Sequence, residues 1–260
     1  MSFKDKVVWI TGASTGIGKA LAIELDRQGA KLAISARSED KLQVLAETFR
    51  DALVLPMDVT SLEANLAAVD KIMAHFGRLD IAVFNAGISL GENVGAFSQQ
   101  FEQIHKVNVL GLAYGIEAAL KVFLPANRGH LVALGSLAGL SGLPDAGAYC
   151  SSKAAVINMM QGLDCQLHKT PITVTTVYPG FVRTPLTAKN SFPMPFLMNA
   201  DKAARIMARG ISTRKRDIYF PFLFSGFLRS LRFLPNAWYV RLLQVAVSKH
   251  KDVKHERDTP

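Results

Sequence analysis

Short apolar runs alternate with amphipathic segments along the first half of the chain. The run at residues 6–11 ends in Gly12, and residues 17–28 then place apolar side chains at helical spacing until Gly29. The same alternation predicts strand–helix pairs at 31–36 and 38–49 and at 52–57 and 61–76, followed by a strand at 79–85. Three such units in succession predict a parallel sheet, because parallel strands need crossover helices between them.

The pattern continues into the second half of the chain. It predicts a long helix at 99–124, a strand at 130–134, a helix at 149–168 and a strand at 173–178. No internal repeat, low-complexity tract or linker divides the sequence. We therefore expect a single α/β domain over residues 1–260.

Two segments depart from this alternation. Residues 184–199 carry Pro185, Pro193 and Pro195 among apolar side chains, which predicts a loop or a broken helix pair; a loop beyond the sheet edge would serve as a substrate lid. Residues 219–247 are rich in aromatic side chains with arginines among them. We interpret this segment as an apolar, basic C-terminal extension within the domain.

Composition narrows the class of protein. A chain of 260 residues that is 49% hydrophobic and 20% charged can bury a full core, which excludes a disordered or collagen-like chain. Its longest stretch without Asp, Glu, Lys or Arg is residues 129–144, which glycines interrupt, so we predict no membrane span. The apolar run near the N-terminus is too short for a secretion signal. We expect a cytoplasmic protein with no metal site and with Cys150 and Cys165 as reduced thiols.

The net charge of +9 belongs to the C-terminal part of the chain. Residues 201–260 hold 13 basic and 5 acidic side chains, whereas residues 1–200 are nearly neutral. The basic residues alternate with large apolar ones, which does not fit a nucleic-acid groove. Two alternatives stay open for the extension: contact with a membrane surface through anionic headgroups, or packing on the domain or a second subunit.

A glycine-rich turn lies between the first predicted strand and its helix. Gly12, Gly16 and Gly18 permit positive φ angles and let backbone N–H groups approach a pyrophosphate, which the helix N-terminus stabilises. After the second strand, no carboxylate is placed for the ribose hydroxyls, but Arg37 suits a 2′-phosphate. The sequence predicts NADP(H) as the cofactor, with NAD(H) as the alternative and a merely solvated Arg37 as the ordinary explanation.

A candidate catalytic group lies at the start of the helix predicted at 149–168. Tyr149 and Lys153 are four residues apart and share a helix face. A phenol that titrates near pH ~10 is a poor acid or base at neutral pH unless a cation stabilises the phenolate, and Lys153 supplies a cation. Ser136 ends a predicted strand at the edge where α/β sheets bind ligands, so its hydroxyl can donate to a substrate carbonyl oxygen.

Together these motifs resemble the short-chain dehydrogenase/reductase family over about residues 5–185. The resemblance is carried by Thr11-Gly-Ala-Ser-Thr-Gly-Ile-Gly18, Asp58-Val59, Asn85-Ala-Gly87, Asn108 within Lys106-Val-Asn-Val109, Gly135-Ser136, Tyr149-Cys-Ser-Ser-Lys153 and Tyr178-Pro-Gly180. It implies a Rossmann-like, doubly wound parallel sheet of about seven strands with helices on both faces, and a nicotinamide cofactor. It also implies a catalytic tetrad of Asn108, Ser136, Tyr149 and Lys153.

The resemblance assigns roles to these residues. Tyr149 is the acid/base, Lys153 lowers its pKa and holds the nicotinamide ribose, and Ser136 orients the carbonyl. Asn108 kinks its helix and holds a water in a proton relay with Lys153. The implied cofactor-binding residues are Gly12, Ser14, Thr15, Gly16, Ile17, Gly18, Arg37, Asp58, Val59, Asn85, Ala86, Gly87, Tyr149, Lys153, Pro179, Gly180, Val182 and Thr184.

The substrate depends on segments where members of the family differ. The lid offers Leu186, Phe192, Met194 and Phe196, which suit a small hydrophobic substrate better than a sugar. We expect an NADP(H)-dependent carbonyl reductase or alcohol dehydrogenase that acts on an acyl, lipid-like or steroid-like substrate. The alternative is a cofactor-binding regulator or scaffold without turnover. The resemblance also implies a homodimer or homotetramer, paired through the helices predicted at 99–124 and 149–168.

Overall fold

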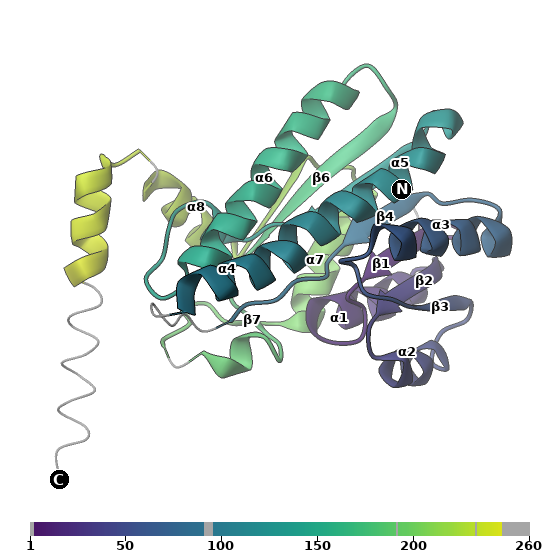
Figure 1. The fold of residues 1–260 in the computed structure, drawn as a ribbon, viewed down its shortest axis with the longest axis horizontal. Coiled ribbons are helices and arrows are strands. Elements are labelled where there is room, and N and C mark those ends of the chain that lie inside the picture. The colour runs from purple at the N-terminus through teal and green to yellow at the C-terminus, as the bar shows by residue number, and fades with distance from the viewer. Residues whose placement is uncertain (1–2, 91–95, 191, 232, 246–260) are drawn as a thin grey trace, which may run out of the picture.

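Seven parallel strands form the centre of the molecule. The computed structural model describes residues 3–90, 96–190, 192–231 and 233–245 (Figure 1). The strand order is β3-β2-β1-β4-β5-β6-β9, so the direction of winding reverses between β1 and β4. The strands are β1 (Val7–Thr11), β2 (Lys31–Ala36), β3 (Ala52–Pro56), β4 (Ile81–Phe84), β5 (Gly129–Leu134), β6 (Ile172–Pro179) and β9 (Asp217–Phe220). The expected doubly wound α/β fold is confirmed.

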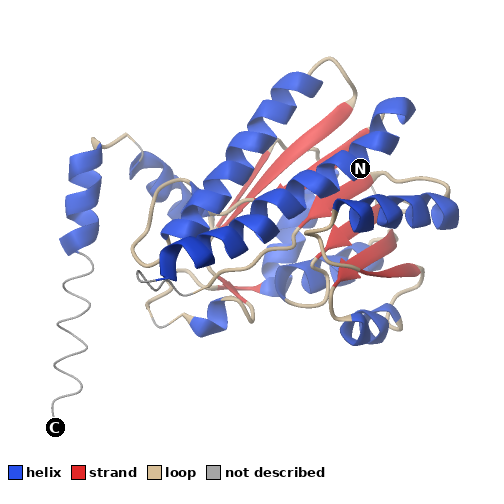
Figure 2. Ribbon diagram, viewed as in Figure 1, coloured by secondary structure: helices blue, strands red, loops and turns tan. Residues whose placement is uncertain are grey.

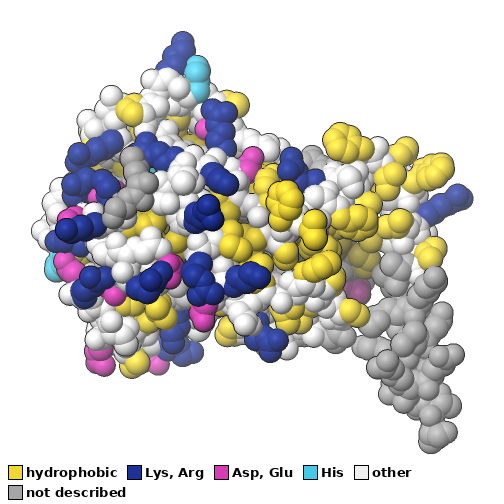
Figure 3. All heavy atoms as spheres, turned by 180° about the vertical axis from the view of Figure 1, so that it is seen from behind, with side chains coloured by type: hydrophobic (Ala, Val, Ile, Leu, Met, Phe, Trp, Pro, Cys, Tyr) yellow, Lys and Arg dark blue, Asp and Glu magenta, His cyan; other side chains and the backbone are white. Residues whose placement is uncertain are grey.

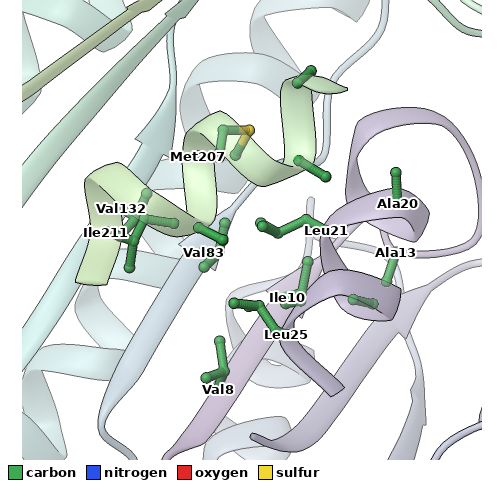
Figure 4. Packing of buried hydrophobic residues seen from close by; sticks show 14 of the residues in the cluster. Val8, Ile10, Ala13, Ala20, Leu21, Leu25, Val83, Val132, Met207 and Ile211 are labelled. Carbon is green, nitrogen blue, oxygen red and sulfur yellow. The ribbon is translucent and has the colours of Figure 1, made fainter. Parts of the chain in front are cut away.

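Helices cover both faces of this sheet (Figure 2). One face carries α1 (Gly16–Arg27), α2 (Glu39–Ala46) and α7 (Ala200–Ser212), and the other carries α3 (Leu62–Phe76), α5 (Gly111–Ala126) and α6 (Gly147–Leu167). Alternate residues of a strand point to opposite faces, so Val8 and Ile10 pack with the first group while Val7 and Trp9 pack with the second. Figure 4 shows the first core, where Leu21, Leu25, Met207 and Ile211 meet the strands.

The predicted long helix is interrupted at a position that matters for the site. α4 (Phe97–His105) passes into a π-helical turn, η2 (Lys106–Leu110), and then into α5. By length and composition alone, Phe97–Ala126 could span a membrane, but 44% of its most apolar window is buried inside the protein. Leu112, Ile116 and Phe123 belong to the core beneath the sheet, so burial in that core explains the apolar character of the helix.

The structure adds elements that the hydrophobic pattern did not predict, among them α7 and β9. α7 packs against α1, and β9 adds the seventh strand beside β6. Tyr219 and Phe220 are residues of β9, so the predicted C-terminal extension loses its first two residues to the sheet. The rest of the described extension comprises α8 (Phe222–Leu231) and a helix at 236–245, while residues 246 and 247 lie outside the described residues.

The two ends of the predicted lid lie side by side. β7 (Val182–Arg183) pairs with β8 (Met198–Asn199), so the chain between them forms a closed excursion. This excursion is a loop, as expected, apart from the single 3₁₀ turn η4 (Thr187–Lys189).

Candidate active site

A cavity of about 550 Å³ lies at the carboxyl ends of the central strands. It spans the point between β1 and β4 where the winding reverses, which is the place where open α/β sheets bind ligands. The predicted site residues that line it are Gly12, Ser14, Thr15, Gly16, Ile17, Arg37, Asp58, Val59, Asn85, Ala86, Gly87, Tyr149, Lys153, Pro179 and Thr184.

The glycine turn is fitted against the loop that follows β4. Gly12 has φ +67°, and a Cβ atom there would lie 2.8 Å from the Cα of Ala86. The side-chain amide of Asn85 donates to the carbonyls of Thr11 and Gly12, at 3.0 and 2.9 Å. Gly18 does not line the cavity; its missing Cβ makes room for Asn85, because a Cβ there would lie 2.4 Å from Asn85 Nδ2. Gly18 therefore lets the turn pack closely against Asn85.

The start of α1 suits an anion. Ser14, Thr15, Gly16 and Ile17 line the cavity at this helix end, where main-chain N–H groups lack helical acceptors. Within this described helix, no acidic residue occupies the first turn and the Thr15 side chain makes no capping bond. The partial positive charge of the helix end is therefore available to a phosphate. This cradle and the cavity above it fit a nicotinamide dinucleotide.

A cationic and an anionic side chain face the far end of the same cavity. Arg37 is exposed at the end of β2, and Asp58 follows β3. The backbone N–H of Thr60 donates to Asp58 at 2.9 Å and is the main cause that lowers the pKa of this carboxyl, with smaller contributions from the charges of Arg37 and Lys106. Asp58 is therefore ionised at neutral pH, and Arg37 stays open to solvent above the cavity.

Tyr149 lines the cavity and forms a hydrogen bond with Ser136. Ser136 follows β5 and caps the short helix η3 (Leu137–Gly139), with its Oγ accepting from the N–H of Ala138 at 3.1 Å. Burial raises the pKa of Tyr149 to about 12, and a hydrogen bond with Ser136 opposes this rise. The phenol therefore holds its proton at neutral pH.

Lys153 enters the cavity from the next turn of α6. Its side chain is only 6% exposed, and its Nζ donates to the carbonyl of Leu134 at 2.7 Å. Burial lowers the pKa of Lys153 to about 8. Its Nζ lies 5.9 Å from the centre of the Tyr149 ring. The implied lowering of the Tyr149 pKa by Lys153 stays a prediction, since burial of the phenol is the main cause acting on this pKa and the net pKa is raised.

Asn108 holds the loop after β4 in place from the π-helical turn. Its Oδ1 accepts from the N–H of Ile88 at 2.8 Å, and its Nδ2 donates to the carbonyl of Ile88 at 2.9 Å and to Ser152 Oγ at 3.0 Å. Ser152 in turn donates to the carbonyl of Tyr149 at 2.7 Å. The side chain of Asn108 thus fixes the cavity wall relative to α6, which makes Asn108 a positioning residue. The implied water relay stays a prediction.

The remaining site residues lie around this centre. The backbone N–H of Gly180 donates to the carbonyl of Phe220 at 2.7 Å, and Val182 is buried in β7. Besides Gly18, four of the predicted site residues do not line the cavity at this end of the sheet: Asn108, Ser136, Gly180 and Val182. Sequence reasoning missed lining residues that flank its motifs or lie one helical turn away from them, and that proximity was the available signal. They are Ala36, Ser38, Met57, Ile88, Ser89, Leu90, Gln103, Val107, Leu134 and Gly135, whereas Pro185 and Leu186 lie in the predicted lid.

Known proteins share both this sequence pattern and this fold. The family model for short chain dehydrogenases matches residues 6–193. An uncharacterized oxidoreductase of Myxococcus xanthus (strain DK1622) is 37% identical over 243 residues, which cover 91% of this chain and 94% of that protein. An uncharacterized oxidoreductase of Listeria monocytogenes is 36% identical over 193 residues, which cover 72% of this chain and 78% of that protein.

Solved structures agree with this placement. A short-chain dehydrogenase/reductase from Burkholderia phymatum in complex with NAD has a TM-score of 0.81 at 24% identity, covering 88% of this chain and 93% of that one. A short-chain dehydrogenase from Burkholderia cenocepacia J2315 in complex with NADP has a TM-score of 0.73 at 29% identity, covering 81% and 92%. The protein therefore belongs to the short-chain dehydrogenase/reductase family of oxidoreductases.

Proposed function

We propose that the protein is an NADP(H)-dependent oxidoreductase that interconverts a hydrophobic ketone or aldehyde and the corresponding alcohol, with Tyr149 as the acid/base. The observation that carries the proposal is the hydrogen-bonded pair of Tyr149 and Ser136, beside the buried Lys153 and in reach of the glycine cradle. A regulator or scaffold without turnover has no need of this arrangement, which favours the enzyme.

The proposed reaction uses two hydroxyl groups on one substrate oxygen. A bound nicotinamide dinucleotide supplies or accepts the hydride. Ser136 Oγ donates a hydrogen bond to the substrate carbonyl oxygen and holds it beside the Tyr149 hydroxyl, which gives that oxygen its proton during reduction. The raised pKa of Tyr149, about 12, keeps this proton in place until the carbonyl oxygen becomes basic. In alcohol oxidation, the same group takes the proton back.

Lys153 and Asn108 support that step in different ways. The ammonium group of Lys153 places a positive charge beside the developing phenolate, because its bond to Leu134 holds it inside the cavity. Asn108 acts through Ile88 and Ser152, which link the cavity wall to the helix that carries Tyr149. We assign the proton transfer to Tyr149 and the positioning to Asn108.

The preference for NADP(H) is supported by the end of β2. Ala36, Arg37 and Ser38 all line the cavity, and none of them carries a carboxylate that would repel a 2′-phosphate. Arg37 offers a guanidinium that can form charge-assisted hydrogen bonds with such a group.

The preference for a hydrophobic substrate is supported by apolar residues in the cavity wall. Ile88, Leu90, Pro185 and Leu186 line the cavity, and an apolar lining selects by burial. The lid also carries Phe192 and Phe196, which are exposed.

Cofactor titration tests the first half of the proposal. Protein fluorescence would be titrated with NADPH and NADH for wild type, Arg37→Ala and the exposed, remote control Arg128→Ala. We expect Arg37→Ala to weaken NADPH binding by about tenfold or more and to leave NADH binding unchanged, since a charge-assisted bond contributes about 1.5–3 kcal/mol. Equal losses for both cofactors, or a preference for NADH, would contradict the NADP(H) assignment.

Turnover measurements test the second part of the proposal, the catalytic role of Tyr149. NADPH consumption would be followed with medium-chain aliphatic ketones for wild type and Tyr149→Phe. We expect Tyr149→Phe to bind NADPH normally and to lose at least about 100-fold in turnover, which is the usual scale of acid–base catalysis. Full activity in Tyr149→Phe would remove its assigned role, whereas NADPH binding without turnover of any carbonyl in wild type would favour the scaffold.

A further inference from the structure

Large apolar side chains gather on the C-terminal part of the molecule and face solvent. Leu223 is 77% exposed and Trp238 is 70% exposed. Figure 3 shows apolar side chains collected at this end, while Lys and Arg side chains dominate the rest of the same view. We call this set the C-terminal apolar surface; its members are Phe192, Phe196, Phe222, Leu223, Phe227, Phe233, Trp238, Leu242 and Val245.

The first helix of this surface is anchored by one face only. Phe224 and Leu228 of α8 pack against the small core of Leu137, Ile157 and Tyr178, and Ser225 between them is buried. The neighbouring face presents Leu223 and Phe227, one helical turn apart, to solvent. The position of α8 is thus fixed by its inner face, and its outer apolar face has no role in that packing.

The second helix, at 236–245, repeats this arrangement. Tyr239 donates to the carbonyl of Gly142 at 2.7 Å, in the segment between Ser136 and Tyr149. Trp238, Leu242 and Val245 follow helical spacing on a face that is exposed. A group of exposed apolar side chains of this kind is typical of a contact site.

The C-terminal apolar surface extends from α8 onto the predicted lid. The ring of Phe196 in the lid lies 5.6 Å from that of Phe224 in α8, and Phe181 lies 5.9 Å from Phe192 and 6.3 Å from Phe224. Leu186 belongs to the same lid, lines the cavity and is partly exposed. Whatever covers this surface therefore also covers Phe192 and Phe196 of the lid, the segment from which Leu186 reaches the cavity.

The charge pattern identifies the partner. Residues 221–245 contain three arginines and no aspartate or glutamate, within a C-terminal part of net charge +8. The exposed Arg229 lies 4.6 Å above the ring of Tyr219, and Arg241 lies on the exposed second helix. Two copies of such a surface would bring like charges together, whereas an anionic bilayer offers headgroups to the arginines and an apolar boundary to the aromatic side chains.

We propose that the C-terminal apolar surface docks the protein on an anionic lipid bilayer, with the lid and the cavity entrance turned toward the membrane. The docking stands on the exposed surface and its charge. The further consequence, that an apolar carbonyl substrate enters from the bilayer, rests on the proposed function.

Vesicle co-sedimentation of the full chain tests the docking. Phosphatidylcholine vesicles with and without phosphatidylglycerol would be compared for wild type, the double variant Leu223→Gln/Trp238→Gln and the control Ile23→Gln/Val44→Gln. The control removes two apolar side chains that are also exposed but lie in α1 and α2. We expect wild type to pellet with the anionic vesicles, the first variant to lose at least about tenfold in partitioning, and the control to match wild type.

A charge variant tests the choice of lipid. Arg241→Gln should lower partitioning to anionic vesicles by about fivefold, since one basic residue near such a surface contributes about 1 kcal/mol, and the remote control Arg128→Gln should not. No pelleting of wild type with anionic vesicles would overturn the proposal, as would equal losses in both apolar variants. A lower mass of Leu223→Gln/Trp238→Gln in lipid-free solution would overturn it in favour of a second copy.

Two further readouts separate docking from catalysis. NADPH titration should be identical in all four variants, which shows that each is folded. Turnover of a long-chain ketone held in anionic vesicles should fall at least fivefold in Leu223→Gln/Trp238→Gln, in step with its partitioning, while turnover of a short water-soluble ketone stays at the wild-type rate. Vesicle binding without any turnover would contradict the proposed function and leave docking intact, and equal turnover of the vesicle-held ketone would overturn entry from the bilayer.

Discussion

The ammonium group of Lys153 on α6 donates a 2.7 Å hydrogen bond to the carbonyl of Leu134 at the end of β5. The bond joins the helix that carries Tyr149 to the strand that leads to Ser136, so it also fixes the spacing of the two hydroxyl groups. Burial lowers the pKa of Lys153 to about 8. Lys153 is therefore charged at neutral pH and loses its charge as the pH rises through about 8.

We predict that kcat/KM for carbonyl reduction falls above about pH 8 in the wild-type enzyme. Tyr149 contributes no fall below pH 10, because its pKa of about 12 keeps it protonated. Lys153→Met should be slower by about 100-fold at pH 7 and should lack the step near pH 8. The measurement is a pH–rate profile from pH 6 to 10, with the exposed Lys71→Met as the control. A step near pH 8 that persists in Lys153→Met would assign it to another group.

We predict that Gly12→Ala damages both the fold and cofactor binding. Gly12 has φ +67°, and a Cβ would lie 2.8 Å from the Cα of Ala86. Because Cα is a backbone atom, the contact could be relieved only by a shift of the main chain. The free energy of unfolding should fall by about 1–3 kcal/mol, and NADPH binding should weaken because the turn shifts. Urea unfolding and fluorescence titration measure the two effects.

The matched control for this substitution is Gly162→Ala. Gly162 lies inside α6, and a Cβ there would meet no described atom within 4 Å. This variant should be more stable than wild type by about 0.5–1 kcal/mol, because alanine favours a helix. If both substitutions changed stability by the same amount, the close approach of Gly12 to Ala86 would not be what requires glycine.

Most strands of the sheet and the glycine turn could be predicted from the sequence, because local residue patterns determine them. Val7–Thr11 and Lys31–Ala36 are apolar runs that end at turns, and their pattern alone predicts them. β9 escaped prediction because it has four residues and pairs with β6 alone, about 40 residues away. α7 was not predicted, although its buried residues Ala203, Met207 and Ile211 follow helical spacing.

The structure brings many of the predicted site residues together at one cavity, but the sequence did not predict their electrostatics. The spacing of Tyr149 and Lys153 places them on one helix face, but the exclusion of water that raises one pKa and lowers the other depends on the whole fold. Likewise, no local pattern shows that Asn108 would bond to Ile88, twenty residues earlier. Such contacts follow from the packing of η2 against the loop after β4.

We predict that His130 makes the protein lose stability in mild acid. Its Nε2 lies 2.7 Å from Thr175 Oγ1, and Thr175 donates its own hydrogen to the carbonyl of Lys215 at 2.6 Å, so the imidazole N–H is the donor to Thr175. Burial lowers the pKa of His130 to about 3. An unfolded chain takes up this proton near pH ~6.5, so the unfolded state binds more protons between these values and stability falls as the pH drops.

The comparison of wild type with His130→Gln isolates this effect. From pH 7 to pH 5, His130 should remove about 2 kcal/mol from the free energy of unfolding of wild type, and the variant should lack that loss. Urea unfolding at the two pH values measures the difference. Equal losses in both proteins would show that His130 accepts its proton in the folded state.

The last prediction concerns a groove of about 700 Å³ between α5 and α6, away from the active site. Ile116, Leu120, Met159 and Leu163 line it, and an apolar groove between two long helices is a suitable contact for a second copy of the chain. Gly162 also lines it, and a side chain there would project into the groove without meeting any described atom within 4 Å.

We therefore predict that Gly162→Lys folds normally and does not self-associate. The lysine should leave the melting temperature close to that of wild type, while its charge and length exclude a partner from the groove. Light scattering coupled to size exclusion should report a dimer or tetramer for wild type and Gly162→Ala and a monomer for Gly162→Lys. Because Gly162→Ala adds a side chain without a charge, an unchanged mass in Gly162→Lys would mean that the chain pairs through another surface or is monomeric throughout.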